Sequence, residues 1–235
     1  MKKRRVFLVL VIAVLLVGIL YGGYRFSKSR KHQFVGEIIN RIETEEKVVA
    51  LTFDDGPTAK TEEILQALES LDIKAAFFLT GQEIEENSKE AESIVKAGHQ
   101  IGNHSYSHNR MMFKSKAFIE YEIDKTTELI KASGYKGTVY FRAPYCKKLF
   151  LLPIALKKRN MVHVTWDVEP DSYLPQGTPA EKIADYVIEN TSSGSIILMH
   201  PMYINNQANI DALPIIVKGL REKGYVFLTV EEMLK

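Results

Sequence analysis

The chain has 235 residues, of which 46% are hydrophobic and 26% charged, as in an ordinary globular protein. This length fits one large domain or two small ones. The single cysteine, Cys146, excludes a disulfide within the chain. Of the 31 Lys and Arg, 8 fall in the first 34 residues, which contain no Asp or Glu. The remainder carries 23 basic against 29 acidic residues, which argues against a nucleic-acid partner.

The N-terminus combines a basic cluster with an apolar run. Lys and Arg fill residues 2–5, and residues 6–24 follow without a charged side chain. A run of this length is long enough to cross a bilayer. We favour an uncleaved membrane anchor over a cleaved secretory signal, because Ala13 is the only alanine in the run and the usual cleavage motif is missing. Basic residues flank both ends, so they leave the orientation nearly balanced and suit contact with anionic lipid.

The predicted organisation has three parts. Residues 1–24 form a cytoplasmic tip and membrane anchor, residues 25–46 a polar linker, and residues 47–235 a single folded domain. Within and just beyond the linker, residues 38–47 are predicted to add a helical turn. We find no internal repeat and no low-complexity segment.

Short apolar segments alternate with amphipathic ones along the domain. Buried strands are predicted at residues 48–53, 75–81, 100–105, 138–144, 161–168, 195–200 and 225–230. Helices are predicted at residues 58–71, 88–98, 115–134, 149–159, 178–190 and 210–224. For the helix at 178–190, we expect Thr178 as the cap, Pro179 at the first helical position and Glu181 as the partner in a capping box.

This alternation predicts an α/β fold of about seven parallel strands with outer helices. A barrel and a doubly wound sheet both fit the pattern. In both architectures, ligand sites form at the carboxyl ends of the strands.

Residues able to do chemistry occur at the ends of the predicted strands. They are Asp54 and Asp55 after the first strand, His104 and His108 after the third, Arg142 and Tyr145 after the fourth, Asp167, Glu169 and Asp171 around the end of the fifth, and His200 after the sixth. Adjacent side chains on a strand face opposite sides, so two neighbouring Asp can serve one site only where the strand ends. Gly56-Pro57 marks such an end, although an ordinary acidic turn has the same composition. Because all the candidate residues lie at the same edge of the predicted sheet, we expect them to form one common site.

His104 and His108 are four residues apart, so one helical turn would place both imidazoles on one face. This is the spacing of paired metal-ligand histidines, although two loop histidines can also fall four apart by chance. A carboxylate from another strand end would complete a set of three protein ligands. Three ligands leave a position open for water or substrate, as catalytic zinc sites require.

Four stretches occur in the order and spacing of a known family. They are TFDDGP at 52–57, HSYSH at 104–108, RAPY at 142–145 and LMH at 198–200. This series resembles the motifs of polysaccharide deacetylases, the NodB-homology domain of carbohydrate esterase family 4, over about residues 48–235. The resemblance implies a distorted (β/α) barrel, here preceded by one transmembrane helix.

The resemblance also implies roles for the matching residues. Asp55, His104 and His108 are expected to bind one divalent metal ion, most simply zinc, although the same ligands accept Co²⁺, Ni²⁺ or Mn²⁺. Asp54 is then the catalytic base, which removes a proton from a water molecule that the metal activates. Arg142 is expected to orient that base and keep it ionised.

The remaining matches concern the leaving group and the substrate. His200 corresponds to the acid that protonates the leaving amine, and the backbone N–H of Tyr145 to an oxyanion donor. Leu198 and Trp166 are expected to contact the substrate. A structural role remains open for three of the matches: an ion pair for Arg142, a core position for Leu198 and a capped strand end for His200.

Two features depart from the family pattern. The fourth motif commonly supplies an acid to the catalytic histidine, and here WDVEPDSY at 166–173 offers three acids. We expect Asp171 to keep His200 protonated, with Glu169 as the alternative. Cys146 stands where glycine often follows the third motif; it could ligate the metal, but beside a complete Asp-His-His set we expect a small wall residue.

The predicted function is metal-dependent hydrolysis of N-acetyl groups on an N-acetylglucosamine polymer, with release of acetate. The anchor and a surface domain without disulfides suggest a bacterial cell membrane with the catalytic domain outside, so peptidoglycan is the first choice of substrate. Chitin oligomers, poly-N-acetylglucosamine and acetylated xylan remain alternatives, as does a secreted form. A non-catalytic envelope scaffold that retains the fold is the alternative from another class.

Overall fold

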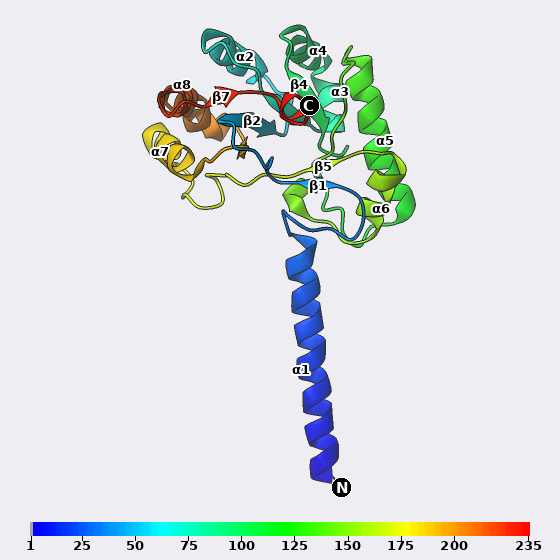
Figure 1. Cartoon of the computed structure of the whole chain (residues 1–235). Helices are drawn as coiled ribbons and strands as arrows, with labels where there is room; N and C mark the ends of the chain where they lie inside the picture. Colours follow the sequence, from blue (N-terminus) through cyan, green and yellow to red (C-terminus); the bar gives the residue numbers. More distant parts are fainter. Residues whose placement is uncertain (1) are drawn as a thin grey trace.

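The computed structural model describes residues 2–235, which form one long helix joined to a compact α/β domain (Figure 1). Helix α1, Lys2–Ser27, projects away from the domain and enters it beside β1, β5 and α6. Residues Lys3–Ser27 have a mean hydropathy of 2.8 over their most apolar part and are long enough to span a membrane. The predicted apolar helix is therefore present. Anchors and signal sequences share this length and composition.

Parallel strands form the centre of the domain. The strands β4 (Gln100–Asn103), β3 (Ala76–Leu79), β2 (Val48–Asp54) and β6 (Ile196–Met199) lie side by side in that order. Strand β7, Val226–Phe227, pairs with the beginning of β2. All these pairs are parallel, as the alternation of strands and helices predicts.

Single bridges extend this sheet into a ring. Phe141 bridges Asn103 of β4 on one side and His163 of β5 (His163–Val164) on the other. Val168, a few residues further along, bridges Ile197 of β6. The ring thus closes without a continuous ladder of hydrogen bonds, which makes it a distorted barrel, as expected.

Three predicted strands are much shorter than the sequence pattern suggested. Residues 225–230 contain only the two residues of β7, and helix α9, Val230–Met233, begins at the last of them. Residues 138–144 contribute only the bridge at Phe141, and residues 161–168 only β5 and the bridge at Val168. The carbonyl groups of Val164 and Thr165 accept hydrogen bonds from the guanidinium of Arg142, at 3.2 and 3.1 Å. Because these carbonyls bind a side chain inside the barrel, they do not extend a ladder.

Helices cover the outside of the barrel (Figure 1). They are α2 (Thr61–Ser70), α3 (Gly81–Glu86), α4 (Ser88–Lys96), α5 (Lys116–Ala132), α6 (Leu151–Lys158), α7 (Ala180–Asn190), α8 (Gln207–Glu222) and α9 (Val230–Met233). All six predicted helices are present, and α3 and α9 were not predicted. Short 3-10 turns occur at Pro144–Cys146 and Ile204–Asn206.

Two local predictions are wrong. Helix α7 begins one residue after Pro179 without a side-chain cap, because the hydroxyl of Thr178 donates to the carbonyl of Pro175 instead. The helical turn predicted in residues 38–47 is absent. Ile38–Ile39 form β1, which pairs with β5 and so joins the segment after α1 to the barrel.

The alternation along β2 separates two layers of core. Val49, Leu51 and Phe53 face the outer helices and belong to the larger hydrophobic cluster. Ala50, on the opposite face, packs in a smaller cluster inside the barrel. Asp54 lies on that inner face by the same period of two, so a carboxylate enters the barrel at the carboxyl end of β2.

Candidate active site

The two adjacent carboxylates reach one site because the chain leaves β2 between them. Asp54 is the last residue of the strand, whereas Asp55 has φ of 72° and so departs from extended geometry. The next residue, Gly56, has φ of 77°, and a Cβ atom there would lie 2.9 Å from the side chain of Met202. Glycine is therefore required by both backbone and space. The carboxylate of Glu83 accepts the N–H of Gly56 at 2.7 Å and holds this turn.

The two histidines occupy a loop after β4 rather than a helical turn, so that part of the prediction is wrong. Ser105 and His108 have φ of 67° and 53°, which no helix contains. Glu122 of α5 holds the loop: its carboxylate accepts the N–H groups of Tyr106 and Ser107 at 3.0 and 2.9 Å and the hydroxyl of Ser107 at 2.7 Å. The loop, and not helical spacing, brings the imidazoles together.

Asp55, His104 and His108 form a cluster whose ligand atoms all lie within 4.8 Å of one another. Oδ1 of Asp55 is 3.3 Å from Nε2 of His108 and 3.9 Å from Nε2 of His104. Ligands at about 2.0–2.2 Å from a tetrahedral zinc ion are themselves about 3.3–3.6 Å apart. The observed separations are therefore close to those of a metal site.

In the part of the chain that the structure describes, no hydrogen bond stabilises the Asp55 carboxylate against His104 in the absence of a cation. Oδ1 of Asp55 is buried and has no hydrogen-bond partner among the described residues. Nδ1 of His104 lies 2.8 Å from the carbonyl of Arg142, so its proton resides there and Nε2 presents a lone pair. Burial lowers the pKa of His104 to about 3, so the ring is neutral. A carboxylate oxygen and an imidazole lone pair that face each other fit a bound divalent ion.

Arg142 is fully buried inside the barrel and binds Asp54. One guanidinium nitrogen donates to Oδ1 of Asp54 at 2.6 Å and to the hydroxyl of Thr52 at 2.9 Å. The guanidinium carbon lies 3.9 Å from the ring centroid of Phe78. Burial lowers the pKa of Arg142, while the charge of Asp54 acts in the opposite direction. With its other donors bound to backbone carbonyls, the guanidinium fixes the orientation of the Asp54 carboxylate.

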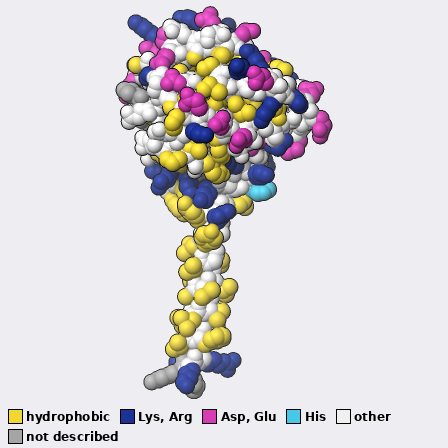
Figure 2. Space-filling model, turned by 90° about the vertical axis from the view of Figure 1, so that its left-hand side faces the viewer, with side chains coloured by type: hydrophobic (Ala, Val, Ile, Leu, Met, Phe, Trp, Pro, Cys, Tyr) yellow, Lys and Arg dark blue, Asp and Glu magenta, His cyan; other side chains and the backbone are white. Residues whose placement is uncertain are grey.

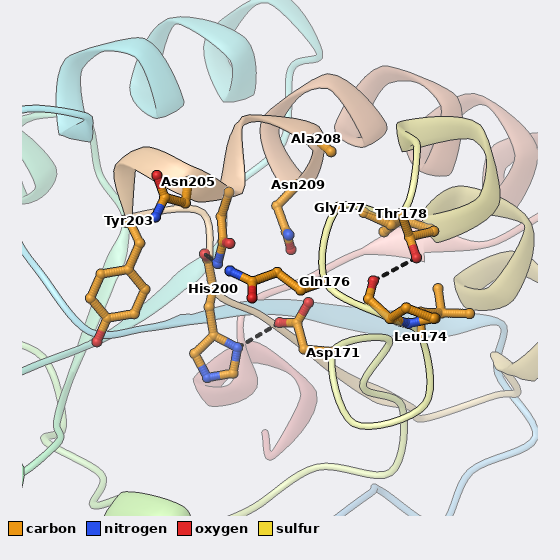
Figure 3. Close-up of a pocket in the computed structure, with 13 residues that line it drawn as sticks. Asp171, Leu174, Gln176, Gly177, Thr178, His200, Tyr203, Asn205, Ala208 and Asn209 are labelled. Atoms are coloured by element: carbon orange, nitrogen blue, oxygen red, sulfur yellow. Dashed lines mark hydrogen bonds and ion pairs between the residues drawn. The ribbon is translucent and has the colours of Figure 1, made fainter.

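His200, at the end of β6, pairs with Asp171. Nδ1 of His200 lies 2.7 Å from Oδ2 of Asp171, and Figure 3 shows the two side chains joined across the loop that follows residue 170. Burial opposes a charge on the imidazole, but the hydrogen bond to Asp171 and the charges of Asp54 and Asp55 outweigh it. Together they raise the pKa of His200 to about 9. This pairing is the one that the sequence analysis favoured over Glu169.

The other two acids of the fourth motif have different partners. Asp167 accepts the hydroxyl of Ser195 and the N–H of Ile196, both at 2.8 Å, and so holds the edge of the barrel. Burial raises its pKa. Glu169 accepts the indole N–H of Trp166 at 2.9 Å and the hydroxyl of Ser172 at 2.7 Å. Asp167 is thus placed away from the cleft, whereas Glu169 lines it.

Most of these groups line one cleft of about 580 Å³, whereas Arg142, Asp167 and Asp171 do not. Its lining includes Asp54, Asp55, both histidines of the loop, His200, Tyr145, Leu198, Trp166 and Cys146. Leu198 is 1% exposed and packs with Trp166 inside the barrel, whereas Tyr145 is 54% exposed. Cys146 forms part of the wall, and burial raises the pKa of its thiol, which does not suit a thiolate ligand.

A second cavity, of about 270 Å³, shares His200 and Tyr203 with the cleft. Figure 3 shows the side chains of Gln176, Asn205 and Asn209 around it. His200 therefore lies between the cleft and the second cavity, and Asp171, which lines the second cavity, binds it from that side.

Sequence reasoning missed several residues that build the site. Glu83 and Glu122 hold the two metal-ligand loops, Tyr203 lines the cleft, and Arg30 reaches the cleft from the segment after α1. Glu122 had a detectable signal, because it falls on the buried face of α5 between Ile119 and Thr126, where an acid is unexpected. The positions of Tyr203 and Arg30 depend on long-range packing and had no local signal.

Comparison with known proteins agrees with the motif series. The polysaccharide deacetylase family matches residues 41–151. A peptidoglycan-N-acetylglucosamine deacetylase of Bacillus cereus is 34% identical over 192 residues, which cover 80% of this chain and 68% of that protein. A bifunctional xylanase/deacetylase of Pseudobutyrivibrio xylanivorans is 33% identical over 197 residues, which cover 81% of this chain but only 31% of that larger protein.

Solved structures show the same fold. The Bc1960 peptidoglycan N-acetylglucosamine deacetylase superposes with a TM-score of 0.79 at 31% identity, covering 83% of this chain and 91% of that one. BA3943 of Bacillus anthracis, described as a pseudoenzyme of carbohydrate esterase family 4, superposes with a TM-score of 0.75 at 28% identity, covering 84% of this chain and 68% of that one. The chain belongs to the polysaccharide deacetylases of carbohydrate esterase family 4, a family of hydrolases that cleave N-acetyl amide bonds.

Proposed function

We propose that this chain is a metal-dependent deacetylase that removes N-acetyl groups from N-acetylglucosamine residues of peptidoglycan and releases acetate. The observation that carries the proposal is the buried, unpartnered Oδ1 of Asp55 facing two imidazoles. On either side of that cluster lie a carboxylate bound to arginine and an imidazole bound to a carboxylate. These are the three parts that metal-dependent amide hydrolysis uses: a cation site, a base and an acid.

Asp55, His104 and His108 would hold the metal ion, and two nitrogens with one carboxylate suit zinc, with cobalt, nickel or manganese as alternatives. A bound divalent ion supplies Lewis acidity, which polarises the acetamide carbonyl and lowers the pKa of a water molecule. The hydrogen bond from Nδ1 of His104 to the carbonyl of Arg142 fixes the ring so that Nε2 faces the site.

Asp54 acts as the general base in this proposal. Its Oδ1 is held by Arg142, which leaves Oδ2 to accept the proton of the attacking water. Each of the three guanidinium nitrogens of Arg142 donates at least one hydrogen bond, so Arg142 acts by positioning the carboxylate and balancing its charge. The backbone N–H of Tyr145 is the proposed donor to the carbonyl oxygen as it gains negative charge.

His200 acts as the general acid. Asp171 binds Nδ1, so Nε2 is the nitrogen that delivers a proton. When the amide C–N bond breaks, the hydroxyl of water stays on the acetyl carbon and Nε2 protonates the departing nitrogen. The products are acetate and the free amine of the sugar. Leu198 and Trp166 form an apolar wall, which we assign to the acetyl methyl group and the face of the sugar.

The choice of peptidoglycan rests on the names of the relatives and on α1. We propose that α1 anchors the chain in a bacterial cell membrane with the domain outside, where the wall polymer lies. Deacetylation of chitin oligomers, poly-N-acetylglucosamine or xylan is the alternative within the same chemistry, and a secreted form is the alternative for the anchor.

The test measures acetate released by the full chain in detergent from purified peptidoglycan, chitin oligomers and acetylated xylan. Release is expected to disappear with a chelator and to return with Zn²⁺ or Co²⁺. Asp54→Asn is expected to lower turnover by about 10²–10⁴-fold while the metal content is unchanged. Release that persists in the chelated, metal-free protein would rule out the metal-dependent mechanism.

A non-catalytic scaffold is the second candidate, because the fold is shared with a protein described as a pseudoenzyme. The same Asp54 variant separates the two functions. An enzyme loses turnover with this substitution, whereas a scaffold releases no acetate from any polymer before or after it. The complete set of acid, base and metal-ligand residues in one cleft supports the enzyme.

A further inference from the structure

The segment that follows α1 is built into the wall of the catalytic cleft. Ser27, the last residue of the helix, is fully buried, and its carbonyl accepts the N–H of Lys148 at 2.9 Å. The carbonyl of Ser29 accepts a hydrogen bond from the ammonium group of Lys148. The family match covers residues 41–151, so Ser27 and Ser29 precede the matched residues whereas Lys148 belongs to them.

Arg30 connects this segment to the fourth motif. Its guanidinium lies 2.5 Å from Oε2 of Glu169 and 4.6 Å from the ring centroid of Trp166. Its carbonyl accepts the hydroxyl of Thr165 at 2.7 Å. Because Glu169 and Trp166 both line the cleft, Arg30 orders one wall of the site while lining it itself.

Lys28 adds a charge that nothing in the cleft balances. Arg30 pairs with Glu169, Arg142 with Asp54, and His200 with Asp171. Lys28 lines the same cleft, its ammonium 5.0 Å from the ring centroid of Tyr24, and it has no carboxylate within 4.0 Å among residues 2–235. A divalent ion with Asp55 would leave a further positive charge.

The surroundings have the same sign. Figure 2 shows Lys and Arg side chains gathered on the part of the domain next to the point where the helix enters it. Arg110 lies over the ring of Tyr145, another lining residue of the cleft, with 5.2 Å between guanidinium carbon and centroid. The opening of the cleft is therefore electropositive at the side where α1 joins the domain.

We propose that residues 28–30 form a binding site for an anionic group on the glycan, such as a carboxylate beside the sugar that is deacetylated. Arg30 holds the wall against which the sugar rests, and Lys28 binds the anionic group. The inference rests on the proposed function and narrows its substrate class from N-acetylated glycans in general to negatively charged ones. Peptidoglycan with carboxylate-bearing peptide stems fits this class, whereas neutral chitin oligomers do not.

The experiment compares Lys28→Ala with Lys31→Ala in the full chain in detergent. Lys31 is an exposed lysine of the same segment that does not line the cleft, so it controls for general loss of positive charge. Lys28→Ala is expected to raise KM for intact peptidoglycan about two- to fivefold, to leave kcat unchanged, and to weaken the increase of KM with salt. KM for chitin oligomers is expected to stay the same.

Arg30→Ala tests the wall. It is expected to lower kcat/KM by about tenfold for both substrates, since a partly buried charge-assisted hydrogen bond is lost. Metal content and the far-ultraviolet circular dichroism spectrum are expected to match the wild type, and Arg30→Lys is expected to recover part of the loss.

The outcomes separate this inference from the proposed function. If the wild type releases no acetate from any polymer, the proposed function itself is wrong. If the wild type is active but Lys28→Ala and Lys31→Ala have equal effects and salt dependence, the anionic site is wrong. Unchanged kcat/KM in Arg30→Ala would show that the segment after α1 is not part of the site.

Discussion

The pairing of His200 with Asp171 makes the alkaline limit of activity depend on one carboxylate. The acid role requires the protonated imidazole, and the raised pKa of His200, about 9, keeps it protonated at neutral pH. Activity is therefore present below this pKa and lost as the pH rises through it. In Asp171→Asn the charge is gone while the size of the side chain is retained, so the loss of activity is expected at lower pH.

The structure sets the size of this shift. A hydrogen bond to a charged partner stabilises by about 1.5–3 kcal/mol, and 1.36 kcal/mol corresponds to one pKa unit, so the shift is about one to two units. His200 and Asp171 retain 23% and 32% exposure of their side chains, so solvent screening favours the lower value. Asp171 is not one of the proposed metal ligands, so the difference between the two proteins isolates the contribution of Asp171.

The assay is the pH dependence of kcat/KM for acetate release, from pH 6 to 10, for wild type and Asp171→Asn. Asp185→Asn is the matched control, because Asp185 is 58% exposed on α7 and pairs only with Lys182. The alkaline limb is expected to move down for Asp171→Asn and to stay in place for the control. An unchanged limb in Asp171→Asn would refute the claim that Asp171 holds the proton on His200.

Three further substitutions test other parts of the molecule. Glu122→Ala is expected to weaken zinc affinity about 10–100-fold, measured by competition with a chelator, because the histidine loop loses its three hydrogen bonds; Glu122→Gln should lose less. Arg142→Met is expected to reduce the free energy of unfolding in urea by about 3–5 kcal/mol, since Asp54 remains buried without its partner; adding Asp54→Asn should recover part of this loss. Burial lowers the pKa of His99 to about 4 in the folded protein, below the unfolded value, so stability is expected to fall as the pH drops from about 6.5 to 4, by about 3 kcal/mol at most. The thermal midpoint measured across that range should fall less steeply in His99→Gln, which keeps an acceptor for the N–H of Ala75, and equal slopes would contradict this account.

Two of the errors in the predicted fold share one origin. Residues 138–144 and 161–168 are apolar and β-rich, yet the structure contains only short bridges there. The reason is Arg142, which lies inside the barrel and binds the backbone carbonyls that a ladder would need. A local pattern records which residues prefer strands, but it does not record a buried side chain that competes for their backbone.

Local sequence pattern also failed to predict the backbone conformation of the candidate site. The sequence predicted that Asp55, His104 and His108 would meet, and they do, but through a loop with left-handed residues rather than a helical turn. Spacing of four residues fitted both geometries. Contacts from other elements decided between them, among them those of Glu122 in α5 and the hydrogen bonds from the N–H groups of Gly81 and Gln82 to the carbonyls of the loop.

The sequence by itself determined the period of the strands and helices and the place of the polar candidate residues at the strand ends, because neighbours along the chain carry this information. The roles proposed for those residues come from the motif series, which is also read along the chain. The tertiary structure alone decided three other features. It placed Asp171 rather than Glu169 against His200, it turned Glu169 toward Arg30, and it brought the segment after α1 into the cleft wall. The first two contacts join residues 29 and 139 positions apart, and those of the segment after α1 with Lys148 and Thr165 span more than a hundred positions. No local preference reaches so far, and packing of the whole barrel sets these distances.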